Sequence, residues 1–356
     1  MFFLYVQKYH THIKCLWITK NYNLYKKLKD EGLPVNYAYN LDGIINNAIA
    51  KYIFVTHGAH DVNEYLTRNA VIIDFFHATC PIKIVGYASG LEPFKPESFI
   101  RKLYFYLTSF HVYVKPSYAI TSSNFTAEIT RSNFEIDEKN VLRLGLPETD
   151  LLLNKTKEIN KKTDFLIKDI VKNLDYDNII LFLPTWRSNP DFNLFHYDFN
   201  SVDLENMLKN TKSVLLIKLH PFDEKNANNM LLYENKRLII LDLLGDEINL
   251  LLRMASIFIT DYSSLWADYL IFNRPMIFAQ YDHEKYLSER AIYDYEKDLP
   301  GYKVKNWPEL IDKVQSIIID GNDSFEEKRL DMKKKIYDYA DGKSCERIYN
   351  FVNELQ

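Results

Sequence analysis

The sequence predicts an α/β protein made of two doubly wound domains, each with a parallel sheet. Short runs rich in β-branched and aromatic residues alternate with longer amphipathic segments along the chain. This alternation occurs in residues 1–150 and again in residues 151–334. A length of 356 residues also suits two domains that each bury a core. Strands that alternate with helices pair in parallel, because each helix carries the chain back to the end where the previous strand began.

The elements follow in order along the chain. In the first half, strands are expected at 14–19, 35–39, 52–55, 70–75, 118–121 and 141–144, and helices at 24–31 and 41–50. In the second half, strands are expected at 179–183, 214–219, 238–241, 257–260 and 275–278, with helices between them. The segment 151–172 is rich in Lys and Asn and is expected to contain the linker between the domains.

The composition excludes several classes of protein. Hydrophobic residues make up 47% of the chain and charged residues 26%, which excludes a disordered protein. The net charge of -4 provides no basic field for nucleic acid. The three cysteines, Cys15, Cys80 and Cys345, form no CxxC pair, so the sequence indicates neither a zinc site nor a disulfide framework. This cysteine usage is typical of a reducing cytoplasm.

Two observations concern membranes. The apolar run 1–6 is too short for a signal peptide, and no apolar run reaches the roughly 18 residues that a membrane-spanning helix needs. Residues 94–118, however, mix aromatic and basic side chains, among them Phe99, Lys102 and Tyr104. This mixture is typical of a helix in a membrane surface, although a core helix between the domains would carry similar residues. We expect a cytoplasmic protein whose only membrane contact is peripheral, at the inner face of the cell membrane.

Polar side chains follow four of the predicted strands. In open parallel sheets, ligands bind beyond the carboxyl ends of the strands. The segments at these ends are Pro184-Thr185-Trp186-Arg187, His220-Pro221, Thr260-Asp261-Tyr262-Ser263-Ser264 and His77-Ala78-Thr79. Arginine can hold phosphate through two parallel hydrogen bonds, and serines at a helix N-terminus lie beside free N–H groups. Together these segments predict a phosphate-binding site.

Each of these residues also has a purely structural interpretation. The alternatives are an N-cap for Ser263 or Ser264, a surface ion pair for Arg187 and a satisfied loop histidine for His220. His57 and His60 resemble a metal site, but histidines three residues apart in a loop are more often structural. Asp175 and Asp177 precede their strand, so they lie at the wrong end of the sheet for a metal-dependent transferase.

A longer pattern extends over the second half of the chain. It consists of Leu183-Pro-Thr-Trp-Arg187, Lys218-Leu-His-Pro221, Phe258-Ile-Thr-Asp-Tyr-Ser-Ser264, Asp268-Tyr269, Arg274-Pro-Met-Ile-Phe278, Tyr281-Asp282, Tyr295-Glu-Lys-Asp-Leu-Pro-Gly301 and Asp341-Gly-Lys-Ser-Cys-Glu-Arg347. In this order the motifs resemble the CDP-glycerol glycerophosphotransferase family, whose members make teichoic-acid and capsule polymers. The resemblance covers most of residues 179–347.

The resemblance implies a GT-B-type protein with two Rossmann-like domains facing across a crevice. Residues 1–150 would form the acceptor-side domain and residues 151–334 the CDP-donor domain, and a final helix at about 335–356 would pack back on the first domain. The residues expected around the donor are Thr79, Pro184, Thr185, Arg187, His220, Thr260, Asp261, Ser263, Ser264 and Asp268. Neither a metal nor another cofactor is expected in the transfer.

The first half departs from the family pattern at two places. The family motif His-Gly-Thr-Pro, followed by basic residues, is replaced by His77-Ala78-Thr79-Cys80-Pro81-Ile82-Lys83. At the domain junction, Gly145-Leu-Pro-Glu-Thr-Asp150 places Glu148 where the family has an arginine. Lys83 and Glu148 are expected on the acceptor side. The change at Glu148 leaves the identity of the transferred alcohol open.

The expected reaction transfers glycerol phosphate or ribitol phosphate from a CDP-alcohol to a hydroxyl of a polysaccharide or lipid-linked acceptor and releases CMP. His77 is predicted to be the general base, because it follows a first-domain strand and imidazole is largely neutral at cytoplasmic pH. His220 and Arg187 are predicted to stabilise the phosphate charge. Two other functions stay open: a glycosyltransferase that uses a nucleotide sugar, and a non-catalytic scaffold in capsule assembly.

Overall fold

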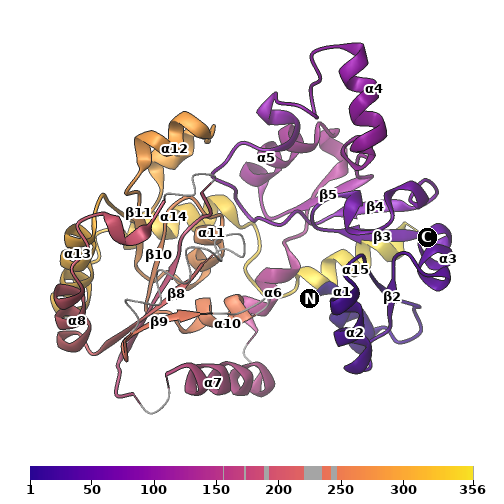
Figure 1. Ribbon diagram of the computed structural model, residues 1–356. Helices are drawn as coiled ribbons and strands as arrows, with labels where there is room; N and C mark the ends of the chain where they lie inside the picture. The colour runs from indigo at the N-terminus through magenta and orange to yellow at the C-terminus, as the bar shows by residue number, and fades with distance from the viewer. Residues whose placement is uncertain (155, 172–173, 188–191, 220–234, 242–246, 356) are drawn as a thin grey trace. The chain divides into compact units, whose positions relative to one another are not determined.

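The computed structural model describes residues 1–356 apart from 155, 172–173, 188–191, 220–234, 242–246 and 356 (Figure 1). The chain forms two compact units. The first unit comprises Met1–Cys80, Ile84–Leu151 and Lys335–Gln356, and the second comprises Pro81–Lys83 and Leu152–Lys334. Both units alternate strands with helices, and the paired strands of all three sheets run parallel. The predicted α/β class with parallel sheets is therefore confirmed.

The first unit contains a four-stranded sheet and a separate pair of strands. The sheet consists of β3 (Tyr52–Val55), β4 (Val71–Asp74), β5 (Tyr118–Thr121) and β6 (Val141–Arg143), in that order, and the pair consists of β1 (Trp17–Thr19) and β2 (Val35–Tyr37). All six strands lie inside the predicted ranges. Four of those ranges were longer than the observed strands, because a β-favouring run can extend beyond the residues that pair.

The helices of this unit include three that the sequence pattern did not indicate, α1, α5 and α6. They are α1 (Phe2–Tyr9), α2 (Tyr22–Asp30), α3 (Leu41–Ile49), α4 (Phe99–Thr108), α5 (Asn124–Phe134), α6 (Pro147–Leu153) and α15 (Ser344–Glu354). Phe2 and Val6 of α1 lie one turn apart and pack with Ile348 of α15 in a core that also contains Ile73 and Ile120. The N-terminal apolar run therefore forms a packed helix.

The carboxylate of Asp150 holds the C-terminal helix in the first unit. Its two oxygens accept hydrogen bonds from the backbone N–H groups of Ser344, at 2.8 Å, and Cys345, at 2.7 Å. A carboxylate is favourable at this end of α15, because the N-terminus of a helix carries a partial positive charge. Gly145 has a φ of +79°, and a Cβ there would lie 2.5 Å from Oγ of Ser344. The absence of a side chain at Gly145 thus lets the start of α15 pack closely against the backbone at this position.

The second unit contains a six-stranded parallel sheet in the order β12-β11-β10-β7-β8-β9. Its strands are β7 (Asn178–Leu183), β8 (Ser213–Lys218), β9 (Leu238–Leu241), β10 (Ile257–Thr260), β11 (Met276–Ala279) and β12 (Tyr302–Val304). The sequence predicted the first five within about one residue at each end. It did not indicate β12, because three residues with an exposed Lys303 in the middle are too short to form a pattern.

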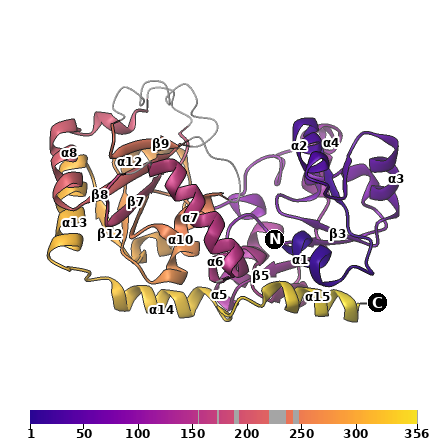
Figure 2. The same cartoon turned by 90° about the horizontal axis from the view of Figure 1, so that it is seen from below.

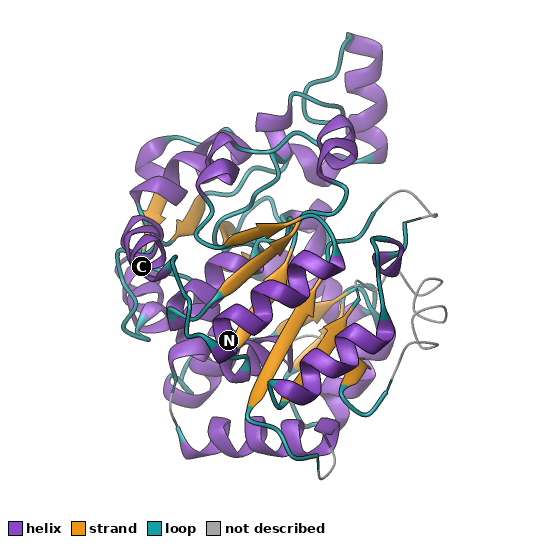
Figure 3. Ribbon diagram, turned by 90° about the vertical axis from the view of Figure 1, so that its left-hand side faces the viewer, coloured by secondary structure: helices purple, strands orange, loops and turns teal. Residues whose placement is uncertain are grey.

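Helices cover both faces of this sheet (Figures 2 and 3). They are α7 (Lys157–Val171), α8 (Ser201–Asn210), α10 (Glu247–Met254), α11 (Leu265–Tyr269), α12 (His283–Glu289), α13 (Trp307–Ile319) and α14 (Glu326–Ile336). Helices α8 and α13 lie side by side, as do α7 and α10. The expected linker 151–172 is mostly α7, because Ile159, Thr163, Ile167 and Val171 recur at helical spacing and the last three are buried.

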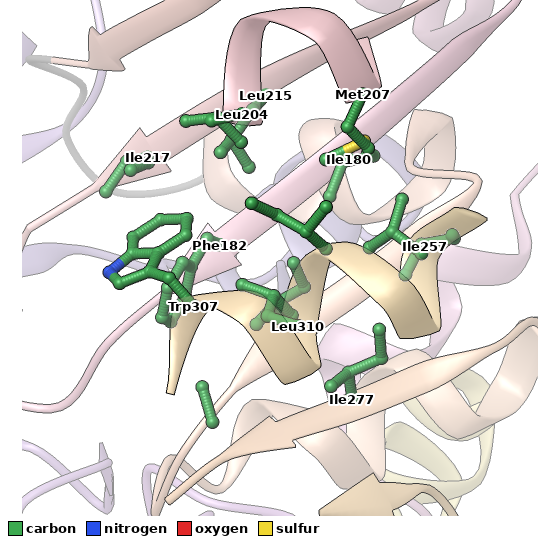
Figure 4. Packing of buried hydrophobic residues seen from close by; sticks show 14 of the residues in the cluster. Ile180, Phe182, Leu204, Met207, Leu215, Ile217, Ile257, Ile277, Trp307 and Leu310 are labelled. Carbon is green, nitrogen blue, oxygen red and sulfur yellow. The ribbon is translucent and has the colours of Figure 1, made fainter. Parts of the chain in front are cut away.

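The main core of the second unit lies between the sheet and the α8–α13 pair (Figure 4). Ile180, Phe182, Leu215 and Ile217 point from the sheet towards these helices, and each is at most 1% exposed. Trp307 at the start of α13 is fully buried, and its indole N–H donates to the carbonyl of Leu194 at 2.8 Å. This packing fixes the strand ends from which the polar segments emerge.

Helix α4 exposes several large apolar side chains. It stands away from the four-stranded sheet (Figure 1), and Phe99, Ile100 and Leu107 are 79%, 78% and 69% exposed. Within the first unit, α4 is therefore an exposed helix and not part of the core. Among the described residues, the structure contains no helix with the length and apolar character needed to span a membrane.

Candidate functional site

The sheet of the second unit reverses its strand order between β7 and β10. The chain proceeds from β7 to β8 and β9 on one side, and from β10 to β11 and β12 on the other. Ligands of doubly wound proteins bind at such a switch point, beyond the carboxyl ends of the strands. Two of the predicted segments, 184–187 and 261–264, leave the sheet at this point. The topology therefore brings them together as expected.

A buried carboxylate joins these two segments. Oδ1 of Asp261 accepts hydrogen bonds from the backbone N–H of Thr185 at 2.9 Å, from Oγ1 of Thr185 at 2.5 Å and from the N–H of Tyr262 at 2.6 Å. Asp261 is only 2% exposed. Hydrogen bonds from N–H and O–H groups stabilise a carboxylate in such a position. Thr185 and Asp261 thus fix the geometry of the switch point.

Arg187 connects this pair to a third strand end. Its Nε and Nη2 donate to Asp282 at 2.7 and 2.9 Å, its Nη2 also donates to Asp261 at 2.8 Å, and its Nη1 donates to the carbonyl of Thr185 at 2.6 Å. Burial lowers the pKa of the guanidinium, but Asp261 and Asp282 outweigh burial and raise it. The fork that we expected on a donor phosphate instead holds two carboxylates, one after β10 and one after β11.

Three aromatic rings surround the Arg187 guanidinium. Its Cζ lies 4.7 Å from the ring centroids of Phe192 and Tyr286 and 5.2 Å from that of Tyr262. The rings of Tyr262 and Tyr286 stack at 3.7 Å with an angle of 4° between their planes. Burial, together with the nearby aspartates, raises the pKa of both phenols, so they stay protonated at neutral pH. The charges of the cluster are therefore those of Arg187, Asp261 and Asp282.

A cavity of about 320 Å³ opens beside this cluster. Its walls combine the aromatic residues Phe192, Tyr197 and Tyr286 with charged residues of both signs, namely Arg187, Lys285, Asp282 and Glu289. Aromatic rings offer flat apolar surfaces, and the lysine adds a positive charge. The cavity can therefore accommodate a ligand that has both a planar ring and an anionic group.

The segment Pro81–Lys83 belongs to the second unit, although the chain on both sides of it belongs to the first. The carbonyl of Ile82 accepts a hydrogen bond from the N–H of Tyr293 at 2.9 Å, and Lys83 forms an antiparallel bridge with Ile292. Nζ of Lys83 lies 6.0 Å from the ring centroid of Tyr286. Lys83, which was expected on the acceptor side, thus lies beside the Arg187 cluster.

The serines at the switch point precede a short helix. Oγ of Ser263 accepts a hydrogen bond from the N–H of Leu265 at 3.3 Å, as a capping residue does. Ser264 is the N-cap residue of α11 and makes no capping hydrogen bond with its side chain. The structural interpretation therefore accounts for Ser263 and leaves Ser264 as a candidate for ligand binding.

Other predicted donor residues of this unit are buried in its framework. Oγ1 of Thr260 donates to the carbonyl of Leu183 at 2.8 Å, so this hydroxyl links β10 to β7 and does not face a ligand. Pro184 is buried directly after β7, and Asp268 is 8% exposed within α11. His220 and Pro221 lie outside the described residues.

His77 is exposed and lies after β4 in the first unit. Its ring stacks on that of His57, with centroids 4.5 Å apart and an angle of 6° between the planes. The preceding residue, Phe76, has a φ of 53°, a left-handed conformation that is unfavourable for a bulky residue. Oδ1 of Asp74 accepts a hydrogen bond from the N–H of Phe76 at 2.6 Å. The buried Asp74 therefore helps to hold the turn that presents His77.

The remaining predicted residues of the first unit are placed as follows. Thr79 is buried two residues after His77. Glu148 lies in the first turn of α6, where the helix dipole favours a carboxylate. Burial, with contributions from Asp150 and Glu148, raises the pKa of the Cys345 thiol, so Glu148 lies near the start of α15.

No group of three or more His, Cys, Asp or Glu side chains is arranged to hold a metal ion in the part of the chain that the structure describes. His57 is instead joined to Thr56, whose Oγ1 lies 3.0 Å from Nδ1 of His57. His60 lies beside His111, with ring centroids 5.1 Å apart. These contacts agree with the structural interpretation of the loop histidines.

Two residues of the site were not assigned by the sequence. Asp282 is one of the residues that carry the family resemblance, but a lone aspartate after a strand does not reveal that it pairs with Arg187, 95 residues away. Tyr286 lies inside α12, where a tyrosine reads as a packing residue. Tyr286 is four residues after Asp282, so the two lie on the same side of a helix, and this spacing was the signal in the sequence that could have connected them.

The comparison with family models identifies the family of the chain. The family model described as CDP-Glycerol:Poly(glycerophosphate) glycerophosphotransferase matches residues 1–354. The teichoic acid ribitol-phosphate polymerase TarL of Staphylococcus aureus (strain NCTC 8325) is 30% identical over 285 residues, which are 79% of this chain and 47% of that protein. The chain thus spans about half the length of this relative.

A shorter relative and a solved structure add to this result. The teichoic acid ribitol-phosphate primase of Bacillus spizizenii (strain W23) is 29% identical over 295 residues, which are 81% of this chain and 70% of that protein. The structure of the wall teichoic acid polymerase TagF has 22% sequence identity and a TM-score of 0.76, covering 99% of this chain and 84% of that one. This likeness concerns the fold and supports the GT-B-like assignment.

Proposed function

The chain belongs to the CDP-glycerol:poly(glycerophosphate) glycerophosphotransferase family, and from this premise we propose that it transfers a polyol phosphate from a CDP-alcohol to a hydroxyl of a teichoic-acid-like or capsular acceptor. Two relatives named for ribitol phosphate make CDP-ribitol a donor to test beside CDP-glycerol. The observation that carries the proposal is the cavity lined by Tyr197, Lys285 and Tyr286, which lies beside the switch point of the second unit.

The proposed reaction is a substitution at phosphorus. The acceptor hydroxyl oxygen forms a bond to the β-phosphorus of the donor, and the bond from that phosphorus to the oxygen bridging the two phosphates breaks. CMP leaves with the electron pair of the broken bond. The proton of the acceptor hydroxyl passes to a general base. Such a step depends chiefly on positioning and charge neutralisation.

We assign the donor to the carboxyl edge of the second unit's sheet. The cavity beside Tyr197 and Tyr286 offers aromatic surfaces for the cytosine ring, and Lys285 offers a charge for a phosphate. Ser264 adds a hydroxyl at the start of α11. His220 retains its predicted role of stabilising phosphate charge.

Arg187 takes a different part from the one predicted by its residue type. A phosphate could use its fork only by displacing Asp282, which already forms two hydrogen bonds with it. We therefore propose that Arg187 is a positioning residue that holds the ends of β7, β10 and β11 in the geometry that binds the donor. Its positive charge still contributes to the field at the site.

We propose His77 as the general base. It is exposed, and its stacking on His57 fixes the plane of the ring. The strained turn at Phe76 supports a functional role, because such a conformation persists only where the surrounding structure enforces it. Metal independence remains part of the proposal, with protein cations supplying the neutralisation. CDP should therefore raise the melting temperature equally in EDTA and in magnesium.

We further propose that α4 lies in the surface of a membrane, at the inner face of the cell membrane. Six exposed apolar or aromatic side chains fall within an arc of about 160° on the helical wheel. They are Phe99, Ile100, Leu103, Tyr104, Tyr106 and Leu107. Arg101 and Lys102 flank this arc on its two sides, and Arg101 is paired with Glu92, whereas Phe105, on the opposite side, is half-buried. An exposed apolar face with basic residues at its edges is typical of a helix that lies in a membrane surface.

The experiment that tests the proposed function is an assay of nucleotide release from a panel of donors. CMP should appear with CDP-glycerol or CDP-ribitol and an acceptor, and a UDP-sugar should give no product. Release of UDP from a UDP-sugar would favour the glycosyltransferase alternative. No release from any donor, in a protein that is folded, would favour the scaffold.

A further inference from the structure

We infer that Lys83 binds a phosphate of the donor, so that a residue from the first half of the chain completes the site of the second unit. This inference rests on the proposed function. The first observation is the placement of the segment. Pro81–Lys83 is assigned to the second unit, whereas the residues on both sides of it belong to the first. Its main chain is held there by the bridge from Lys83 to Ile292 and by the bond from Tyr293 to Ile82.

The second observation concerns the neighbours of the ammonium group. Nζ of Lys83 lies 6.0 Å from the ring of Tyr286, the same ring that Arg187 approaches at 4.7 Å. Asp261 attracts the Lys83 charge, and Arg187 and Arg290 repel it. The ammonium therefore lies in the field of the Arg187 cluster and close to the cavity that Tyr286 lines.

The third observation is that no hydrogen bond or ion pair joins Lys83 to a carboxylate in the described part of the chain. Asp261 accepts four hydrogen bonds from Thr185, Tyr262 and Arg187. Three of these bonds reach Oδ1 and one reaches Oδ2, so both oxygens of Asp261 already accept from other groups. Asp282 is committed to Arg187 through both oxygens. The nearby acids are thus engaged by other donors, and Lys83 has no anion of its own.

A half-buried ammonium without an anion is unfavourable, because burial removes part of its hydration. Burial lowers the pKa of Lys83 to about 8, and Arg187 and Arg290 add to this effect while Asp261 opposes it. The phenol of Tyr286 stays protonated and supplies no charge. A phosphate would supply the missing anion and would favour the protonated, charged form of Lys83. Since lysine acts as a point charge, it can approach a phosphate without the planar fit that arginine needs.

The test is calorimetry of CDP binding to the full chain. Lys83→Gln should weaken CDP binding about 10-fold or more, the effect of a charge-assisted hydrogen bond. Lys83→Arg keeps the charge and should retain most of the affinity. Lys313→Gln is the matched control, because Lys313 also lies over a tyrosine ring, at 4.4 Å from the centroid of Tyr302, but on α13. It should bind CDP as the wild type does.

Proton uptake distinguishes a phosphate ligand from a structural lysine. At pH 8 the wild type should take up about half a proton per CDP bound, because a group with a pKa near the pH is half neutral before binding. Lys83→Arg should take up none. The number of protons taken up is measured by repeating the calorimetry in buffers of different ionisation enthalpy, since the observed heat changes in proportion to that number.

The outcomes separate two failures. Equal CDP affinity in wild type and Lys83→Gln, or equal proton uptake in wild type and Lys83→Arg, would overturn the role of Lys83 and leave the proposed function standing. Absence of CDP binding to the folded wild type would overturn the proposed function and this inference with it. If Lys83→Gln does not fold, the proton uptake of the wild type and Lys83→Arg still decides.

Discussion

Arg187 and Asp282 form a two-bond ion pair, with Nε to Oδ2 at 2.7 Å and Nη2 to Oδ1 at 2.9 Å, between residues that are 95 positions apart in the sequence. Both side chains are at most 6% exposed. The pair joins the segment after β7 to the segment after β11, and Asp261 adds the segment after β10. Three loops at the carboxyl edge of one sheet thus share a single guanidinium.

This arrangement predicts that removing the Arg187 guanidinium greatly lowers the free energy of unfolding. Arg187→Met leaves two buried carboxylates without their cation, and breaking such a pair typically costs about 3–5 kcal/mol. Urea unfolding of the variant should show a loss of this order in the free energy of unfolding. Arg131→Met, which removes an exposed ion pair with Glu128, should cost less than about 1 kcal/mol. Similar losses in the two variants would contradict the role of Arg187 in joining the loops.

The buried carboxyl of Asp74 predicts a pH dependence of stability. Burial raises the pKa of Asp74 to about 7, the nearby Asp61 adds to this, and the hydrogen bond from Phe76 opposes it. The folded state therefore binds a proton that the unfolded state, with a pKa of about 4, releases. The free energy of unfolding should fall as the pH rises from about 4 to 7.

Asp74→Asn should remove this component of the pH dependence and raise the stability at pH 8 by at least about 1 kcal/mol. The amide keeps an oxygen that can accept the hydrogen bond from Phe76. Asp61→Asn is a comparison variant, because Asp61 is a partly exposed neighbour. An Asp74→Asn variant that is less stable than the wild type at pH 8 would show that the carboxylate is charged and satisfied in the folded protein.

The sequence predicted the strands of this fold other than β12 and the sheet edge at which the candidate site lies. Parallel strands such as β8 and β10 are continuous runs of buried residues, so local pattern suffices to locate them. The partners of Arg187 could not be predicted in this way. A residue type indicates which ligands a side chain can hold, but only the folded chain decides whether a carboxylate such as Asp282 already occupies it.

The same limit applies to Lys83 and to α4. The motif that contains Lys83 reads as part of the first domain, and its assignment to the second unit depends on contacts with Ile292 and Tyr293 that have no local signal. For α4, aromatic and basic residues suited both a buried and an exposed helix. Burial is a tertiary property, so the structure was needed to decide between the two.

The exposed face of α4 predicts binding to anionic lipid. A variant with Ile100, Leu103 and Leu107 changed to Ser loses apolar area and keeps Arg101 and Lys102. Its association with liposomes that contain anionic lipid should fall several-fold in a flotation assay. The control changes Leu41 and Ile49 of α3 to Ser, since these residues are also exposed, at 72% and 69%. Equal flotation of the two variants and the wild type would contradict membrane binding through α4.

The role of His77 predicts a selective loss of catalysis. His77→Ala should retain CDP binding and folding, while the transfer rate falls by about 100-fold or more. The acidic limb of the pH–rate profile should disappear, because protonation of the base no longer limits the rate. His12→Ala, at an exposed histidine of the same unit, should behave as the wild type. Nearly full transfer by His77→Ala would show that another residue takes the proton.

The proposed transfer is tested most directly by following both products of one reaction. The full chain is incubated with CDP-glycerol or CDP-ribitol and a lipid-linked acceptor, CMP is quantified, and the acceptor is analysed by mass spectrometry. The account predicts that each CMP released is matched by one polyol phosphate added to an acceptor hydroxyl. CMP that appears without any gain in acceptor mass, or an acceptor that gains only a sugar from a nucleotide sugar, would contradict it.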